Sequence, residues 1–152
     1  MPIRYLLESD LEAISAVCVD SFMATVAPGL SAQGVATFLG VASAEAFGAR
    51  MKADNAILVA VEGGRPVGVI ELKEGQHVAM FFVAPAHQRQ GIGKALLAAV
   101  LPQARGDVVT VKASLSSVPA YVGYGFECSG EVGEVAGLVY QPMTLTLERA
   151  GK

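Results

Sequence analysis

The sequence predicts an α+β fold in which helices flank a mostly antiparallel mixed sheet, and three observations support that class. Strand and helix patterns alternate along the chain in the outline order β-α-α-β-β-β-α-β-α-β-β. Three successive β-runs between residues 55 and 83 are joined by short turns, which favour antiparallel hairpins. The length of 152 residues is that of one domain, so a single domain is expected to span residues 1–152.

The N-terminal third of the chain is predicted to be one strand followed by helices. Residues 3 to 7 form a short apolar strand, and residues 8 to 10 supply capping and acidic groups before a helix. That helix carries apolar side chains at helical spacing, namely Leu11, Ile14, Val17, Cys18 and Phe22. After the helix-breaking Pro28-Gly29 pair, Ser31 caps a helix to about residue 41 and Ser43 another to about residue 52, which the outline order counts together.

The remainder of the chain alternates strands with two helices. Residues 55 to 61, residues 66 to 73 and the run that ends at Val83 are strands, with turns at 62 to 65 and at 74 to 75. A helix is predicted from residue 92 to about residue 101, then a strand over 108 to 114 and a short helix over 117 to 124. Two further strands follow from Phe126 onward, the last over residues 143 to 147.

The loop between Val83 and the helix at residue 92 has the composition of an anion site. Gly91 and Gly93 bracket the start of that helix, where backbone N–H groups lack intrahelical partners and the helix dipole is positive. Glycine keeps side chains off these donors and can adopt a positive φ. Residues 77 to 106 carry three Lys or Arg and no Asp or Glu, although the whole chain has a net charge of −3. The sequence therefore predicts a site for a polyanionic ligand here.

The spacing of this loop separates it from two common phosphate loops. A dinucleotide-binding fingerprint requires a third small residue where Leu96 stands, and a Walker loop requires Ser or Thr where Ala95 follows Lys94. The pattern present, Gln88-x-x-Gly91-x-Gly93 after a strand that ends in Phe-Val-x-Pro, resembles the acetyl-CoA loop of the GNAT superfamily of acetyltransferases. A glycine-rich turn that only joins a strand to a helix is the alternative reading of this segment.

A second motif strengthens the resemblance to the GNAT superfamily. After the strand at 108 to 114, the segment Val118-Pro-Ala-Tyr-Val-Gly-Tyr-Gly-Phe126 is similar to the family's short helix with a tyrosine and a closing Gly-Phe. Tyr121 falls on the family's tyrosine position. The family often has Asn between Ser114 and Ser117 and an aromatic residue at Ala120, so the chain departs from the pattern at these places. Tyr124 is interpreted as a packing residue.

The resemblance implies an acetyl-CoA-dependent N-acetyltransferase that moves an acetyl group to a primary amine by direct attack in a ternary complex. The cosubstrate acetyl-CoA would be held at the pyrophosphate by Gln88, Arg89, Gln90, Gly91, Ile92, Gly93 and Lys94, along the pantetheine arm by the Phe82 and Val83 backbone, and at Ser114. The strand that ends at Val83 would diverge from the strand at 108 to 114 to admit that arm.

The chemistry of acetyl transfer suggests two catalytic roles. The leaving thiolate has an ordinary pKa of about 8.5, so a positioned phenol such as Tyr121 can protonate it. A lysine-like amine must lose a proton before it attacks, which costs roughly 4.6 kcal/mol at pH 7, against about 1.4 kcal/mol for an α-amine. Glu71 and His77, expected to face each other across the turn at 74 to 75, are the candidate bases, directly or through a water molecule. A solvated Glu and a hairpin His without a catalytic role are the alternative interpretation of these two residues.

Composition limits the other roles that the chain could have. The net charge of −3 argues against broad nucleic-acid binding, and the glycines, prolines and polar residues between 21 and 44 argue against a membrane span. The start of the sequence has no export signal, which predicts a cytoplasmic protein. A 53% hydrophobic composition suggests a subunit contact such as a homodimer. Cys18 and Cys128 have no neighbours at metal spacing, so reduced core thiols and no metal site are expected.

Two alternatives to the enzyme remain open from the sequence. One is a catalytically silent module of the same fold that binds acyl-CoA and regulates a partner. The other is a nucleotide-binding protein. The acceptor, whether a small molecule or a peptide amine, is not identified, because residues 21 to 52 follow no motif that would name it.

Overall fold

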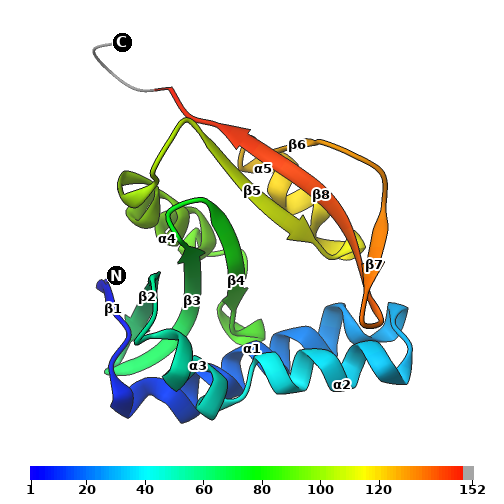
Figure 1. Ribbon diagram of the computed structural model, residues 1–152. Helices are drawn as coiled ribbons and strands as arrows, with labels where there is room; N and C mark the ends of the chain where they lie inside the picture. Colours follow the sequence, from blue (N-terminus) through cyan, green and yellow to red (C-terminus); the bar gives the residue numbers. More distant parts are fainter. Residues whose placement is uncertain (149–152) are drawn as a thin grey trace.

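A computed structural model describes residues 1–148 and confirms an α+β architecture (Figure 1). The elements, in chain order, are β1 (Ile3–Tyr5), α1 (Leu11–Thr25), α2 (Ala32–Val41), α3 (Ala44–Arg50), β2 (Asn55–Glu62), β3 (Arg65–Lys73), β4 (His77–Val83), α4 (Ile92–Val100), β5 (Val108–Ala113), α5 (Val118–Gly123), β6 (Glu127–Cys128), β7 (Gly133–Val135) and β8 (Leu138–Thr146). Single 3₁₀ turns join several of them.

The sheet of the described chain has eight strands in the order β1-β2-β3-β4-β5-β8-β6, with β7 paired to β8 outside that path. Its pairs are antiparallel except for β4 and β5, which run parallel. Helix α4 connects β4 to β5, as a parallel pair requires. The one parallel pair therefore lies in the middle of the sheet, next to the glycine loop.

Two apolar cores cover the two faces of the sheet. On one face, α1, α2 and α3 pack through buried residues such as Phe22, Phe38 and Phe47. On the other face, α4 and α5 pack through residues such as Leu96 and Tyr121. Figure 1 shows α1 and α2 lying along one end of the strands, where they extend beyond β4 toward β7.

The helix starts match the predicted capping residues. The side chain of Ser31 accepts a hydrogen bond from the amide of Gly34, and that of Ser43 accepts one from the amide of Ala46. These bonds satisfy amides that an α-helix leaves unpaired at its first turn. The separate helices predicted after Ser31 and Ser43 are thus confirmed.

The C-terminal strands differ from the prediction. The last strand begins at Leu138 rather than at residue 143, and a hairpin joins it to β7. The two loop residues, Ala136 and Gly137, both have positive φ, 51° and 84°, which is the geometry of a type I′ turn. The sequence did not indicate this turn because Ala at its first position is an unusual choice. Cys128 lies on β6 and is exposed, so its predicted place in the core is wrong, whereas Cys18 is buried.

The tip of the β7–β8 hairpin rests directly on α2 (Figure 1). The hydroxyl of Thr37 donates a hydrogen bond of 2.7 Å to the carbonyl of Ala136. Gly34 and Gly137 meet backbone to backbone, so that a Cβ on either residue would overlap the other chain segment. This contact holds the hairpin against the helices at one end of the molecule.

Within residues 1–148, no helix is long and apolar enough to cross a membrane.

Candidate active site

The strands β4 and β5 pair only at their beginnings and then separate. The register links His77 with Thr110 and Val78 with Val111, and no later pair between these strands follows. β4 also contains one extra residue, Ala79, relative to β3, because Leu72 pairs with Val78 while Glu71 pairs with Met80. Such a bulge bends a strand and shifts the direction of its hydrogen-bonding groups. The predicted divergence of the two strands is therefore confirmed.

A cavity of about 440 Å³ lies at the glycine loop, beside the open part of β4. Its lining includes six residues of the predicted cosubstrate loop and both predicted residues of β4, namely Val83, Phe82, Gln88, Arg89, Gly91, Ile92, Gly93 and Lys94. Residues of α1 and α5 complete it, among them Ser21, Tyr121 and Tyr124. Gln90, although predicted to contact the cosubstrate, is exposed and does not line this cavity.

The backbone amides of this loop have no protein acceptors. Among the described residues, the hydrogen bonds include none donated by the amides of residues 89 to 94, and the first helix bond runs from Ala95 to the Gly91 carbonyl. Arg89 and Gly91 have positive φ, 65° and 81°. Alternation of right- and left-handed residues turns successive N–H groups toward one side, which creates an anion-binding concavity. A Cβ on Gly91 would meet open space, so its φ and the approach of a ligand, not packing, explain glycine here.

The side chain of Gln88 anchors the loop. Its Nε2 donates to the carbonyl of Val83 at 3.0 Å and to the hydroxyl of Ser21 at 3.3 Å. Both N–H groups of the side-chain amide are thus used within the protein. These two bonds tie the loop to β4 and α1, and a contact of Gln88 with the pyrophosphate stays a prediction.

The open edge of β4 offers the amide of Val83. The amide of Ala84 donates to Val67 on β3, so in an antiparallel pair the amide of Phe82, two residues earlier, also points toward β3. The amides of Phe81 and Val83 therefore point to the other side, where β5 has diverged. Of the two predicted backbone contacts, Val83 keeps a free donor, whereas Phe82 contributes its ring.

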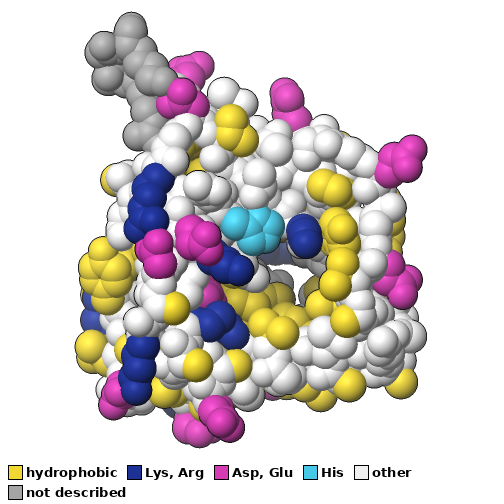
Figure 2. Space-filling model, in the orientation of Figure 1, with side chains coloured by type: hydrophobic (Ala, Val, Ile, Leu, Met, Phe, Trp, Pro, Cys, Tyr) yellow, Lys and Arg dark blue, Asp and Glu magenta, His cyan; other side chains and the backbone are white. Residues whose placement is uncertain are grey.

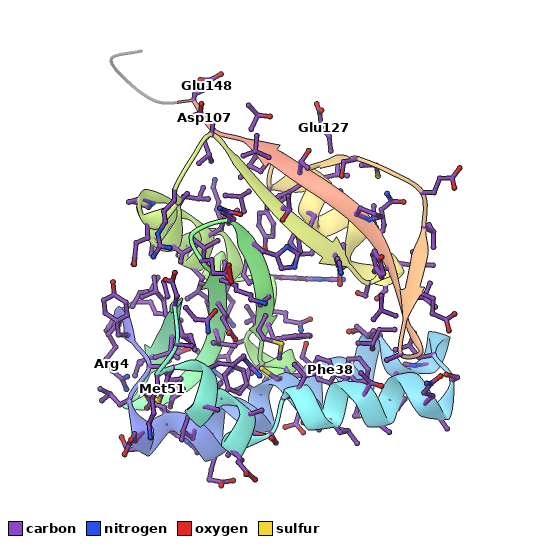
Figure 3. All side chains as sticks on the ribbon, in the orientation of Figure 1. Arg4, Phe38, Met51, Asp107, Glu127 and Glu148 are labelled. Carbon is purple, nitrogen blue, oxygen red and sulfur yellow. The ribbon has the colours of Figure 1, made fainter. Side chains whose placement is uncertain are left out.

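A second cavity of about 370 Å³ lies between α2, the paired part of β4 and β5, and the β7–β8 hairpin. Phe38 stands between the helices and the sheet, with its ring stacked on Phe22 at 3.8 Å and edge-on to Phe82 at 5.4 Å between centroids (Figure 3). Both cavities are lined by Phe81, Phe82, Ser117 and Tyr121. The two cavities therefore meet where β4 and β5 separate.

Tyr121 stands at that junction. It is buried on α5, with its ring packed against Phe81 and Phe126 at centroid distances of 6.0 and 5.2 Å. Burial raises the pKa of Tyr121, so the phenol is protonated at neutral pH and can donate a proton.

Glu71 and His77 do not face each other as predicted. In the register, His77 pairs with Lys73 and Glu71 with Met80. Glu71 is fully buried and accepts hydrogen bonds from Nε of Arg50 at 2.9 and 3.1 Å, and it lines neither cavity. Burial raises the pKa of Glu71 despite this partner. Its surroundings are those of a structural ion pair, so we do not assign it the role of base.

His77 and Ser114 line the second cavity, not the first. The Nδ1 of His77 lies 2.7 Å from the hydroxyl of Thr110, and the hydroxyl of Ser114 lies 2.6 Å from that of Ser117. Ser114, predicted to contact the cosubstrate, therefore does not line the cavity at the glycine loop, but its hydrogen-bond partner Ser117 does. Sequence reasoning missed Lys73, Lys112 and Ser117, whose only signal was their place on strands and turns beside motif residues. Within residues 1–148, no group of three His, Cys, Asp or Glu could hold a metal.

Comparisons with known proteins agree with this geometry. The family model of the acetyltransferase (GNAT) domain matches residues 26–147. No curated protein matches the sequence. Among solved structures, an N-acetyltransferase of Rhodopseudomonas palustris superposes with a TM-score of 0.84 at 24% identity, over 96% of this chain and 95% of that one.

Two further solved structures share the fold. The PaiA N-acetyltransferase of Thermoplasma acidophilum, in complex with coenzyme A, has a TM-score of 0.77 at 21% identity, over 96% and 98% of the two chains. The ribosomal-protein-alanine N-acetyltransferase of Brucella melitensis has a TM-score of 0.67 at 23% identity, over 97% and 100%. At these identities the solved structures show a shared fold, whereas the match to the family model shows membership of the family. With four fifths of its length covered by one family model, the chain belongs to the GNAT family of acetyltransferases.

Proposed function

We propose that the protein is an acetyl-CoA-dependent N-acetyltransferase that transfers the acetyl group directly to a primary amine in a ternary complex. The observation that carries this proposal is the junction of the two cavities at Phe82 and Tyr121. One cavity presents unpaired amides to an anion, and the other has a floor of aromatic rings, so two different substrates can meet at one point. That arrangement supports direct attack without a covalent enzyme intermediate.

The first cavity fits the cosubstrate acetyl-CoA. The unpaired amides of residues 89 to 94, with the side chains of Arg89 and Lys94, provide donors and positive charge for a diphosphate. The amide of Val83 lies farther along the same cavity and would donate a hydrogen bond to the thioester oxygen as that oxygen gains negative charge. The related PaiA enzyme, whose structure holds coenzyme A, supports this assignment.

Tyr121 would act as the general acid. When the amine attacks the thioester carbon, a tetrahedral intermediate forms, and its collapse breaks the carbon–sulfur bond. The phenol hydrogen of Tyr121 passes to the departing sulfur, and the phenolate then recovers a proton from the product nitrogen. The raised pKa of Tyr121 means that the phenol is protonated at neutral pH, so its hydrogen is present when the carbon–sulfur bond breaks.

The acceptor cavity itself helps to supply a neutral amine. Its floor contains the rings of Phe22, Phe38 and Phe82, which disfavour an ammonium ion by desolvation. Desolvation lowers the pKa of a bound amine, so less free energy is needed to remove its proton. This effect takes the place of the base that the sequence assigned to Glu71.

The decisive experiment measures thiol release when the protein is mixed with acetyl-CoA and a panel of primary amines, alongside calorimetry with CoA. Thiol release that depends on the amine, together with CoA binding, is the expected result. CoA binding without transfer to any amine would instead identify the silent acyl-CoA-binding module. Binding of ATP but not CoA would identify a nucleotide-binding protein. A cytoplasmic location and a homodimer stay predictions from the sequence.

A further inference from the structure

A row of basic side chains crosses the sheet at the far end of the acceptor cavity. Lys73 and His77 are directly paired on β3 and β4, and His77 is paired in turn with Thr110 on β5. Directly paired residues and residues two apart on a strand share one face of a sheet, so Lys112, two residues after Thr110, lies on the same face and nearer to the point where β4 and β5 separate. Lys73, His77 and Lys112 all line the cavity. Figure 2 shows Lys and Arg side chains beside a histidine at the edge of a hollow with a hydrophobic floor, and Asp or Glu side chains next to the same histidine on the side away from the hollow.

No acid balances this row inside the cavity. Among the described residues that line the cavity, none is Asp or Glu. Glu71 lies on the same face of β3, but its carboxylate is fully buried and forms an ion pair with Arg50. Asp107, Glu127 and Glu148 lie at the edge of the sheet remote from α2 (Figure 3). The cavity end therefore carries an excess of positive charge that a ligand can satisfy.

The two lysines also interact with neighbouring side chains of the protein, namely His77 and Tyr140. The pKa of His77 is lowered first by its burial and then by the positive charges of Lys112 and Lys73. The ammonium of Lys112 also lies over the ring of Tyr140, 5.1 Å from its centre. Tyr140 thus holds Lys112 at the cavity wall.

The distance along β4 sets the shape of a matching ligand. Because Ala79 is bulged, the stretch of β4 from His77 to Phe82 is paired with only four steps of β3, from Lys73 to Val69, which corresponds to about 13 Å of strand. Phe22, Phe38 and Met80 line the space between these ends. A ligand that fills the cavity would present an amine at Phe82, an apolar middle and an anionic group at the basic row.

We propose that the acceptor is a primary amine that carries a carboxylate several carbons away, and that Lys73, His77 and Lys112 bind this carboxylate. The inference rests on the proposed function and adds the substrate class. It also excludes polycationic amines as preferred acceptors, because a second ammonium would lie against like charges.

Matched acceptors test the proposal. The probes are 8-aminooctanoate, octylamine and 1,8-diaminooctane, which differ only in the charge at the far end, and kcat/KM is measured for each at low salt. We expect the carboxylate to exceed octylamine by about tenfold and the diamine to fall below both. The short pair 4-aminobutanoate and butylamine should show no such preference, since its carboxylate cannot reach the row.

Two variants and a control assign the effect to the row. In Lys73→Met and in Lys112→Met, the ratio of kcat/KM for 8-aminooctanoate to that for octylamine should fall severalfold. Lys52→Met removes an exposed lysine that lines neither cavity and should keep the wild-type ratio. A diamine preferred over the carboxylate, or an unchanged ratio in both cavity variants, overturns the proposal.

Calorimetry separates this proposal from the proposed function. If no amine accepts acetyl but the CoA-loaded protein still binds 8-aminooctanoate more tightly than octylamine, the transferase assignment fails and the carboxylate site stands. If transfer occurs and the binding order is reversed, only the carboxylate site fails. Triglycine and triglycinamide form a further matched pair, which distinguishes a peptide carboxylate from that of a free amino acid with the same chemistry.

Discussion

The hydroxyl of Tyr124 packs against the backbone of Gly93 so closely that a methyl group on residue 93 would overlap it. Gly93 lies in the first turn of α4, and Tyr124 follows α5, so this contact fixes the glycine loop to the segment that carries Tyr121. The ring of Tyr124 is also stacked on Phe81, with 5.6 Å between centroids. The anion site and the candidate acid are therefore parts of one packed unit.

Gly93→Ala should destabilise the protein by roughly 1 to 3 kcal/mol, because the added methyl overpacks this contact. Tyr124→Phe removes the offending oxygen, and the nearest remaining ring atom lies at an ordinary 3.4 Å. We therefore expect the double variant to recover most of the loss in urea unfolding. Additive losses in this double-mutant cycle would show that the two residues do not interact.

Gly91→Asp should weaken CoA binding at least about a hundredfold in calorimetry, because it places a carboxylate beside the unpaired amides. Gly91→Asn is the matched control, since Asn has the same shape, carries no charge and tolerates the positive φ of 81°. Equal affinity of the two variants would contradict the anion site. Far-ultraviolet circular dichroism should confirm that both variants fold.

Tyr121→Phe should lower kcat by about a hundredfold, the contribution typical of a general acid, with little change in the affinity for CoA. Rapid-quench measurement of the acetyl-transfer step gives the rate directly. Tyr124→Phe serves as the matched control, because that tyrosine lines the cosubstrate cavity but not the acceptor cavity. A wild-type rate in Tyr121→Phe would leave this residue a packing role only.

Asp10→Asn should reduce the free energy of unfolding by roughly 1 to 3 kcal/mol at pH 7, since it removes the charge from a carboxylate bonded to Arg4 at 2.7 Å and to the amide of Leu7 at 2.8 Å. Arg4 holds the pKa of Asp10 below its ordinary value. A lowered folded-state pKa gives stability that is present above the unfolded value near 3.8 and is lost as the pH falls through the lower, folded value.

The pH dependence of unfolding therefore provides the check on Asp10. The difference between wild type and Asp10→Asn should be constant above pH 5 and should shrink as the pH falls below 4. Asp20→Asn changes an exposed residue of α1, the helix that directly follows Asp10, and should show no comparable trend. A difference that persists undiminished at pH 2 would mean that the ionised carboxylate is not the source of the stability.

Local patterns were sufficient to predict the helices and the glycine loop. Ser31 and Ser43 mark helix starts because their hydroxyls serve the nearest unpaired amides, and both the signal and the bond are local. The loop at 88 to 94 was found for the same reason, since Gly91 supplies a conformation that few other residues adopt. The fold class followed from the order of such elements.

The details that depend on distant partners were not predictable from the sequence. A single bulged residue, Ala79, changes which side chains on β3 and β4 are opposite each other, and it separates Glu71 from His77. Arg50 reaches Glu71 from 21 residues away and converts an apparent base into a buried ion pair. Likewise, the amide of Gln88 finds Ser21 on α1, a partner 67 residues distant.

The backbone contact between Gly34 and Gly137 limits the ways in which the acceptor specificity can change. Because neither position has room for a side chain, substitutions at these two residues cannot adjust the distance between the β7–β8 hairpin and α2. A wider cavity for bulkier acceptors would therefore require smaller side chains in its wall, for example in place of Phe38. Changes of acceptor, whether evolved or engineered, would thus alter the side chains of the cavity wall and keep both glycines.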